Sequence, residues 1–396
     1  MQHLVCAIFI FQTRSSADVK NQLLLYKVHK RTRSGRDMDK KPVTRKDIAE
    51  LCEVSISVVS RALNNSGYVE ESKRKRIIAT AEKLGYVPQP VAMSLQERRT
   101  KQLLYYCKDL SNEYYIDMYR GMCQTANERG YLITVNGVMT FERIKDTMVD
   151  GIIMPNEDMT SYYMKKGGKN YYLPIVSASF CNAVDIPKSV PLVEADIYKA
   201  MEIALNYLNS MGHKIISYGF PYDMNNPNSR YLAYKEYIKK VIGNSGWEKY
   251  VLAIHKNEMK NDPRIARFSE DLPENSMYQE EDFFGKGKLA AQIFLERKLD
   301  ATAVICFNDG FAIGMIRGFQ ELGVRVPDQI SVMGIDGTGI RKYHSPLLTT
   351  VNMFPQKQGQ ECANILIDMI EKNNKKYMVH IKPKLQLGES VKNLRV

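Results

Sequence analysis

The sequence predicts two folding units of different class: a small all-α unit near the N-terminus and a larger α/β unit in the rest of the chain. Residues 42–87 contain three short helical patterns, whereas from Gln102 onward apolar runs alternate with amphipathic stretches. A connector with two prolines, VPQPVAMSLQERR, separates the two patterns. The length of 396 residues also exceeds what one hydrophobic core usually supports.

The first unit begins with a helix start signal at Thr44. Thr44 precedes Asp47 by three residues, which resembles a capping box and predicts a helix to about Cys52. After a two-residue break, Ser55 is a suitable N-cap for a second helix that ends near Leu63. A third helix follows and carries the run KRKR, which we expect to be mostly solvated.

The second helix has two different faces at 3.6 residues per turn. The apolar face is expected to pack and consists of Val58, Val59, Ala62 and Leu63. The other face consists of Ile56, Ser57, Ser60, Arg61 and Asn64. Such a face fits the major groove of DNA, where its arginine can donate two hydrogen bonds to a guanine. An ordinary surface helix has the same pattern, so the pattern alone leaves both interpretations open.

Positive charge is concentrated at the N-terminal end. Of the net charge of +12, residues 40–101 contribute thirteen Lys and Arg against seven Asp and Glu, or +6, and residues 1–39 contribute +4. The other 295 residues therefore carry only +2. A basic end on a nearly neutral body favours a polyanionic partner such as nucleic acid, although a solvated basic surface has the same composition.

The α/β unit contains seven apolar strand candidates. They are LLYYC, YLITVNG, DGIIMP, YLPIVSAS, KIISYGF, AVICFN and ISVMGI, with amphipathic stretches between most of them. This alternation predicts a parallel sheet covered by helices on both faces.

Cysteine spacing and motif content argue against several classes of site. The seven cysteines include no C-x-x-C pair, which argues against a metal site or a disulfide framework and fits a reducing cytoplasm. No dinucleotide-binding, P-loop, GxSxG or HExxH motif is present, so we expect no enzyme activity and no cofactor. No segment has the roughly 18 consecutive apolar residues of a membrane helix. Residues 1–39 are expected to form an extension before the headpiece. In this extension, residues 1–37 are either disordered or not translated, and in the second case Met38 is the start.

The stretches VTRKDIAELCEVSISVVSRALN and YVEESKRKRIIATAEKLGYVPQPVAMSL closely resemble the helix-turn-helix headpiece of the lactose-repressor (LacI/GalR) family. The resemblance implies that Ile56, Ser57 and Arg61 contact bases. It implies that the positions near the sugar-phosphate backbone are Thr44, Arg45, Ser60, Asn64 and Tyr68. It further implies a hinge helix whose Leu95 wedges into the minor groove. Glu53 and Glu70 depart from the family, which usually has Gly in the turn and a Ser or Thr cap.

From Gln102 the resemblance continues at lower identity through DLSNEYYIDMYRGM, VDGIIMP, AVICFNDG and ISVMGIDG. It implies a periplasmic-binding-protein-like sensor domain of two doubly wound subdomains with an effector in the cleft between them. The implied effector-binding residues are Tyr115, Asp196, Arg230, Asn308 and Asp336. Structural alternatives are a helix cap for Asn308, a surface ion pair for Arg230 and a core position for Tyr115. The stretch between Gly137 and Asp150 is shorter than usual.

The expected domain bounds follow from these patterns and from the resemblance. The headpiece spans residues 40–88, the hinge 89–101, and the ligand-binding and dimerisation domain 102–390. Within that domain, the N-subdomain is expected at about 102–195 and 350–371. The C-subdomain is expected at about 196–349 and 377–390.

These features together predict a cytoplasmic, nucleoid-associated transcription regulator that binds DNA specifically in response to a small molecule. By family habit we expect a homodimeric repressor of carbohydrate-utilisation genes on a near-palindromic operator, with a sugar or sugar derivative as effector. The sequence leaves open whether the effector releases or promotes DNA binding. Two rivals are a periplasmic transport-binding protein, which would lack the headpiece, and an enzyme on the same body fold.

Overall fold

The computed structural model describes most of the chain. The described residues are 43–87, 99–107, 110–137, 144, 147–166, 173–225, 227–254, 282–372 and 378–395. The chain forms two compact units, residues 1–97 and 98–396. Within the described ranges, no helix is long and apolar enough to cross a membrane.

The described part of the first unit, residues 43–87, contains three helices, and the starts of the first two agree with the capping signals in the sequence. They are α3 (Arg45–Leu51), α4 (Ile56–Leu63) and α5 (Glu71–Leu84). The Thr44 side chain accepts a hydrogen bond from the backbone N–H of Asp47, and the Asp47 side chain accepts one from the Thr44 backbone, so the capping box is confirmed. Ser55 caps α4 as predicted. Glu53 adopts φ +48°, a left-handed conformation that costs a non-glycine residue about 1 to 2 kcal/mol.

The apolar face of α4 belongs to the core of the first unit, as predicted. Val59 and Ala62 are buried together with Ile48 of α3 and Ile77 of α5. The KRKR run of α5 is mostly exposed, as expected, and two of its members also brace the fold. The Arg76 guanidinium donates to the Cys52 carbonyl (2.7 Å), and Arg74 donates to the side chain of Asn65 (2.5 Å).

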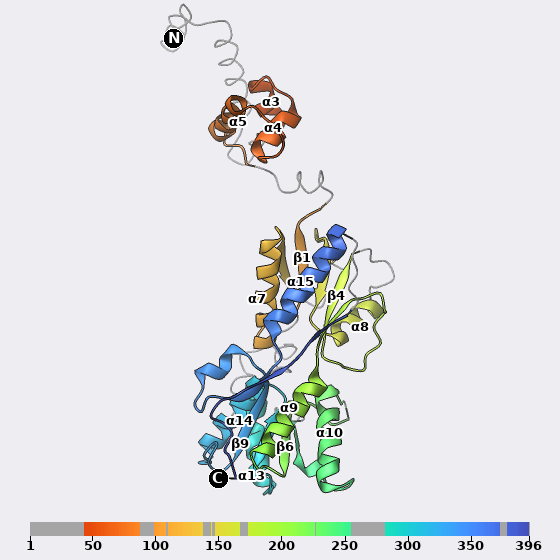
Figure 1. The fold of residues 1–396 in the computed structure, drawn as a ribbon, viewed down its shortest axis with the longest axis vertical. Coiled ribbons are helices and arrows are strands. Elements are labelled where there is room, and N and C mark those ends of the chain that lie inside the picture. Colours follow the sequence, from red (N-terminus) through yellow and green to blue (C-terminus); the bar gives the residue numbers. More distant parts are fainter. Residues whose placement is uncertain are drawn as a thin grey trace, which may run out of the picture. The chain divides into compact units, whose positions relative to one another are not determined.

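The second unit contains two six-stranded sheets (Figure 1). The first sheet has the order β11-β5-β4-β3-β1-β2, and every described pairing in it is parallel. Its strands are β1 (Gln102–Tyr106), β2 (Leu132–Asn136), β3 (Gly151–Met154), β4 (Ile175–Ser179), β5 (Leu192–Ala195) and β11 (Met378–Ile381). The second sheet has the order β12-β10-β9-β8-β6-β7, with β12 antiparallel. Its strands are β6 (Ile216–Phe220), β7 (Val251–Ala253), β8 (Ala303–Cys306), β9 (Ser331–Asp336), β10 (Thr349–Asn352) and β12 (Lys384–Gln386).

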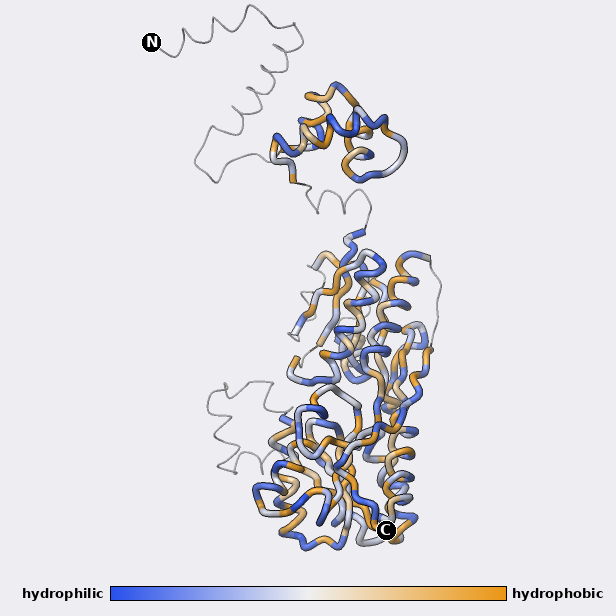
Figure 2. The backbone as a smooth tube through the Cα atoms, turned by 60° about the vertical axis from the view of Figure 1, so that its left-hand side comes forward, coloured by the Kyte–Doolittle hydropathy of each residue, from blue (hydrophilic) through white to orange (hydrophobic). Residues whose placement is uncertain are grey.

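Helices cover both faces of the first sheet. Successive residues of a strand point to opposite faces, and here Leu103 and Tyr105 join one core while Leu104 and Tyr106 join another with Tyr163 of α8. The described helices of the unit are α7 (Glu113–Glu128), α8 (Glu157–Lys166), α9 (Ile197–Ser210), α10 (Ser229–Ile242), α13 (Phe283–Glu296), α14 (Asp309–Glu321) and α15 (Pro355–Lys372). Two short 3-10 helices are η3 (Glu248–Tyr250) and η5 (Gly339–Tyr343). Hydrophobic and hydrophilic residues alternate along the helices, as expected for helices with one buried side (Figure 2).

All seven strand candidates are strands in the structure, but two subdomain bounds need correction. Residues 350–352 were expected in the N-subdomain, yet they belong to β10, which pairs with β9 in the second sheet. Residues 378–381 were expected in the C-subdomain, yet they form β11 and pair with β5 in the first sheet. Strand pairing decides both cases. The chain passes to the other subdomain only after β10 has paired with β9, and it passes back only after β11 has paired with β5.

Close packing of α7 on α15 gives a first prediction. A Cβ atom at Gly121 of α7 would lie 1.9 Å from the Gln356 carbonyl oxygen of α15. Gly121→Ala is therefore expected to lower the free energy of unfolding by about 1 to 3 kcal/mol, measured by urea denaturation. Gly339→Ala is the control, because a Cβ there meets nothing within 4 Å. Equal stability of the two variants would contradict this packing.

Candidate functional site

The outward face of α4 is exposed, as its sequence pattern indicated. Ile56 is 47% exposed, and Ser57 and Arg61 are exposed on the same face. The Arg61 Nε lies 3.4 Å from the Ser57 carbonyl oxygen, a long contact that leaves most of the guanidinium's donors available. This arrangement presents a fork of N–H donors beside short side chains, which suits the edge of a base pair.

Two residues expected near the DNA backbone contact each other. The Arg45 guanidinium donates to the Ser60 hydroxyl and to the Tyr86 hydroxyl, each at 3.2 Å, and thereby links α3 to α4 and to the end of α5. This network orients a cation beside the exposed face of α4. Tyr68 is 86% exposed and free to contact a phosphate or sugar.

The remaining residues of the predicted DNA-binding set have other positions. The Thr44 hydroxyl belongs to the capping box, and Asn64 is the exposed C-cap of α4. Leu95 lies outside the described residues, so its role stays a prediction.

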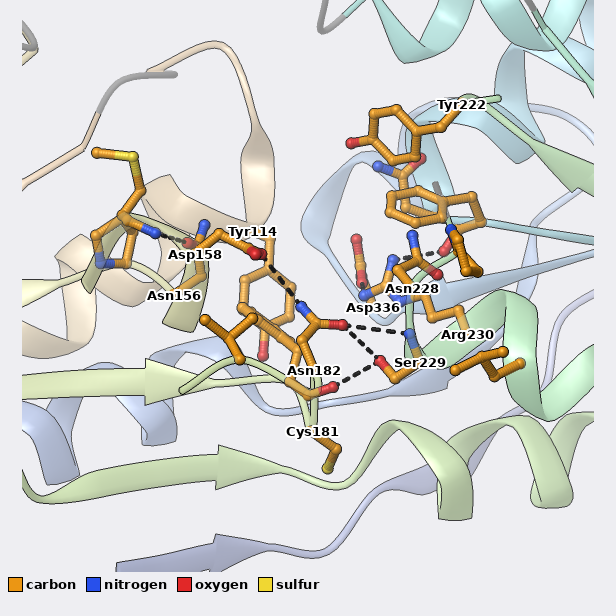
Figure 3. A pocket seen from close by; sticks show the side chains of 18 of the residues that line it. Tyr114, Asn156, Asp158, Cys181, Asn182, Tyr222, Asn228, Ser229, Arg230 and Asp336 are labelled. Atoms are coloured by element: carbon orange, nitrogen blue, oxygen red, sulfur yellow. Dashed lines mark hydrogen bonds and ion pairs between the residues drawn. The ribbon is translucent and has the colours of Figure 1, made fainter. Parts of the chain in front are cut away.

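A cleft of about 530 Å³ lies beside the carboxyl ends of strands from both sheets of the second unit (Figure 3). A cleft of this size suits a small ligand. Its polar lining is Asn112, Asn156, Asp158, Asn182, Asn228, Ser229, Arg230, Asn308 and Asp336. Its aromatic lining is Tyr114, Tyr115, Phe180, Tyr198, Tyr222, Phe283 and Phe307. Four of the five predicted effector residues are among these, namely Tyr115, Arg230, Asn308 and Asp336.

A buried ion pair lies at the cleft. The Arg230 guanidinium donates to Asp336 Oδ1 at 2.9 Å and to the Phe307 carbonyl at 2.6 Å, and it lies 4.4 Å from the centre of the Phe307 ring. Arg230 is 7% exposed and Asp336 is 4% exposed, so the expected alternative of a surface ion pair is excluded. The pair offers a donor and an acceptor side by side, which matches adjacent hydroxyl groups of a ligand.

Asp336 is held in an unusual backbone conformation. Its φ is +138°, in a region that residues other than glycine rarely adopt and that costs about 1 to 3 kcal/mol. Burial raises the pKa of Asp336 to about 8, although the Arg230 guanidinium opposes this shift. Ionising the Asp336 carboxyl group at the cleft wall therefore costs more free energy than ionising an exposed aspartate.

The raised pKa of Asp336 predicts a pH dependence of stability. The unfolded carboxyl has a pKa of about 3.9, so between about pH 4 and 8 the folded state binds more protons than the unfolded state. Stability should fall as the pH rises through this window, by at most about 1.4 kcal/mol per pH unit, and level off above it. We expect the difference in unfolding free energy between wild type and Asp336→Asn, measured by urea denaturation, to show this slope between pH 5 and 8. A difference that does not vary with pH would contradict the shift.

For Asn308 and Tyr115 the sequence left open whether each residue has a structural role or lines the cleft, and in the structure each residue does both. The Asn308 side-chain oxygen caps α14 by accepting from the Phe311 N–H (2.8 Å), while the residue also lines the cleft. The Tyr115 hydroxyl accepts from the Asn156 amide at 2.9 Å, so Tyr115 packs against the core and lines the cleft.

Asp196 was predicted to bind the effector, but it is not among the residues that line the cleft. Its carboxylate accepts a hydrogen bond from the Lys199 N–H at 2.9 Å and caps α9. The residue directly follows β5, and its side chain forms the N-cap of α9.

Sequence reasoning missed Asn182, which connects the two subdomains at the cleft (Figure 3). Its side-chain oxygen accepts from the Ser229 N–H (3.2 Å) and lies 2.9 Å from the Ser229 hydroxyl, at the start of α10. The buried Glu157 carboxylate holds the same loop by accepting from the Asn182 N–H at 3.1 Å. A polar residue just beyond the carboxyl end of β4 is a signal that could have identified Asn182 from the sequence.

Metal binding receives no support from the described part of the chain, where no cluster of three or more His, Cys, Asp or Glu residues has a suitable arrangement. The six described cysteines are free thiols.

Two family models match the chain. Residues 44–89 match the model of bacterial regulatory proteins of the lacI family, and residues 244–391 match the model of periplasmic binding protein-like domains. The HTH-type transcriptional repressor PurR of Vibrio parahaemolyticus serotype O3:K6 is 26% identical over 367 residues, which cover 89% of this chain and 99% of the relative. The HTH-type transcriptional repressor CytR of Escherichia coli K12 is 26% identical over 339 residues, which cover 83% and 90% of the two chains.

Solved structures share the fold. The lac repressor dimer bound to operator and the anti-inducer ONPF has a TM-score of 0.65 at 20% identity, over 89% of this chain and all of that chain. The complex of the regulator CelR with cellobiose has a TM-score of 0.57 at 21% identity, over 88% and 99% of the chains. A regulator from Enterococcus faecium with bound ribose has a TM-score of 0.57 at 20% identity, over 74% and 99% of the chains.

Proposed function

This chain belongs to the lacI family of bacterial regulatory proteins, and we propose that it is a ligand-responsive transcription regulator that binds a specific DNA sequence. The observation that carries the proposal is the exposed face of α4, where Arg61 and Ser57 lie beside Ile56 on a helix whose other face is buried. A major groove admits a helix of this kind, and its base edges offer the acceptors that Arg61 requires.

The proposed DNA site has two halves. One headpiece reads only half of a site. A homodimer has twofold symmetry, and a near-palindromic operator has the matching twofold symmetry. Arg45, Ser60 and Tyr68 are proposed to contact the sugar-phosphate backbone and to fix the register of α4 without reading sequence. The solved relative with operator DNA is a dimer, which supports this arrangement.

The cleft of the second unit is proposed to bind the effector, a sugar or sugar derivative. Arg230 and Asp336 would bind adjacent hydroxyls, Asn308 would add a polar contact, and Tyr115 would form part of the aromatic wall. Solved relatives of the same fold contain ribose or cellobiose, which supports a hydroxylated ring of this kind. We propose that the protein represses carbohydrate-utilisation genes in the cytoplasm, associates with the nucleoid when bound, and has no catalytic role.

Selection of duplexes from a random pool by the purified full-length chain tests this function. We expect enriched sequences with two related half-sites, and we expect a thermal-shift screen of sugars and nucleosides to identify a compound that changes affinity for the enriched duplex. A pool that shows no enrichment, with and without the compounds, would reject the proposal.

A further inference from the structure

We propose that α7 and α15 move as one rigid body that links the effector cleft to the start of β1, and that Gln358 is the positioning residue that engages this pair. The inference rests on the proposed function, because it explains how the cleft can influence the headpiece. The two helices lie side by side along the first sheet (Figure 1).

At the cleft end, a buried amide ties the pair to the cleft wall. The Tyr114 hydroxyl, whose ring lines the cleft, donates to Gln358 Oε1 at 2.7 Å. Gln358 is fully buried, and its amide nitrogen donates to the carbonyls of Val193 (2.8 Å) and Ser179 (3.2 Å). Burying an amide is costly unless its hydrogen bonds are satisfied, and here these three contacts specify one orientation. A displacement of Tyr114 must therefore displace α15 or break this network.

In the middle, the backbones of the two helices are in direct contact. Gly121 of α7 lies against the Gln356 carbonyl, and Gly359 of α15 lies against the Met118 carbonyl, where a Cβ atom would come within 2.0 Å. Without flexible side chains between them, the helices cannot slide past each other at low cost. They are expected to move together.

At the opposite end, ionic contacts tie the pair to the start of β1. Arg129, just after α7, contacts Asp368 (2.9 Å) and Glu371 (2.8 Å) of α15. Lys101 contacts Glu371 at 3.3 Å, and the Arg99 guanidinium donates to the Ile370 carbonyl at 3.1 Å. Residues 99–101 follow the segment that leads from the headpiece, so this end of the pair holds the point where that segment joins the body.

Helices of this length span about 25 Å, so the pair reaches from the cleft wall to residues 99–101. Coupling over such a distance requires an element that both ends can bias, and a braced helix pair satisfies that requirement. The consequence is that the hydroxyl of Tyr114 influences the order of residues 99–101, although the two lie at opposite ends of α7.

Hydrogen exchange on the full-length chain tests the proposal without a ligand. In Tyr114→Phe and Gln358→Leu, amides in peptides covering residues 99–106 and 364–372 should exchange about two- to ten-fold faster than in wild type, as expected for a lost buried hydrogen bond. Gln360→Leu is the matched control, because Gln360 lies on the same helix and its amide contacts Gln124 of α7 at 3.0 Å on the exposed side. That variant should leave both peptides unchanged.

Two outcomes would overturn the inference. One is wild-type exchange at residues 99–106 in Tyr114→Phe. The other is faster exchange that extends equally to residues 303–306 of the second sheet, which would indicate general destabilisation. Because Gln358→Leu can impair folding, the conservative Tyr114→Phe variant decides the matter. A chain that enriches no duplex would reject the proposed function, whereas the exchange experiment would still decide the role of the helix pair.

Discussion

Replacing Arg61 with alanine is expected to remove most of the sequence preference of this chain for DNA while its fold stays intact. Arg61 is exposed on α4, and the stability of the headpiece depends on the buried face that carries Val59 and Ala62. A two-pronged arginine–guanine contact discriminates against other bases by about 1 to 3 kcal/mol, and a dimer would lose one such contact in each half-site. Fluorescence anisotropy with the enriched duplex and a scrambled duplex measures the change.

Lys75→Ala is the control for this experiment. Lys75 is exposed on α5 and makes only a long ion pair with Glu71 at 3.9 Å, so the variant removes the same charge from the same unit. Any change in affinity should be the same for both duplexes, because the loss of an exposed charge alters only the sequence-independent attraction to DNA. If Arg61→Ala also weakened both duplexes alike, Arg61 would be a backbone contact and not a reader of bases.

The second large effect is expected for Arg230→Ala, which should abolish the effector response and leave DNA binding in place. Arg230 supplies the paired donor at the cleft wall and holds both Asp336 and the Phe307 carbonyl. Removing one partner of a buried ion pair typically costs about 3 to 5 kcal/mol of stability. The cost should fall below that range here, because burial already raises the pKa of Asp336 and the orphaned carboxyl can bind a proton.

Calorimetric titration with the compound found by thermal shift, followed by DNA binding with and without it, measures this effect. Arg325→Ala is the matched control, since Arg325 forms an exposed ion pair with Asp328 at 3.3 Å. Exposed pairs contribute little, so this variant should respond as wild type does. An Arg230→Ala chain that still responded to the compound would exclude the Arg230–Asp336 pair from effector binding.

Local signals in the sequence were sufficient for the helices of the headpiece and for seven of the twelve described strands of the body. Thr44 and Ser55 indicated where two helices begin, because a cap depends on residues within one turn. The periodicity of α4 separated its buried face from its exposed face for the same reason. Six of the seven predicted strands are buried, and a buried parallel strand is recognisable as a continuous apolar run, whereas β2 lies at the edge of the first sheet and is partly exposed. Short strands such as β7 (Val251–Ala253) carry too few residues for that signal.

By itself, then, the sequence determined the two units, the helices of the headpiece, seven of the twelve described strands and the face that α4 exposes. Only the tertiary structure decided which polar residues meet. Asp196 and Asn182 both follow strands of the first sheet, yet Asp196 caps α9 while Asn182 reaches Ser229 of the other subdomain. Gln358 gave no signal at all, because its partners lie more than 150 positions away in the chain. Helix periodicity and capping depend on neighbours within a few residues, but a cleft forms only where two sheets meet.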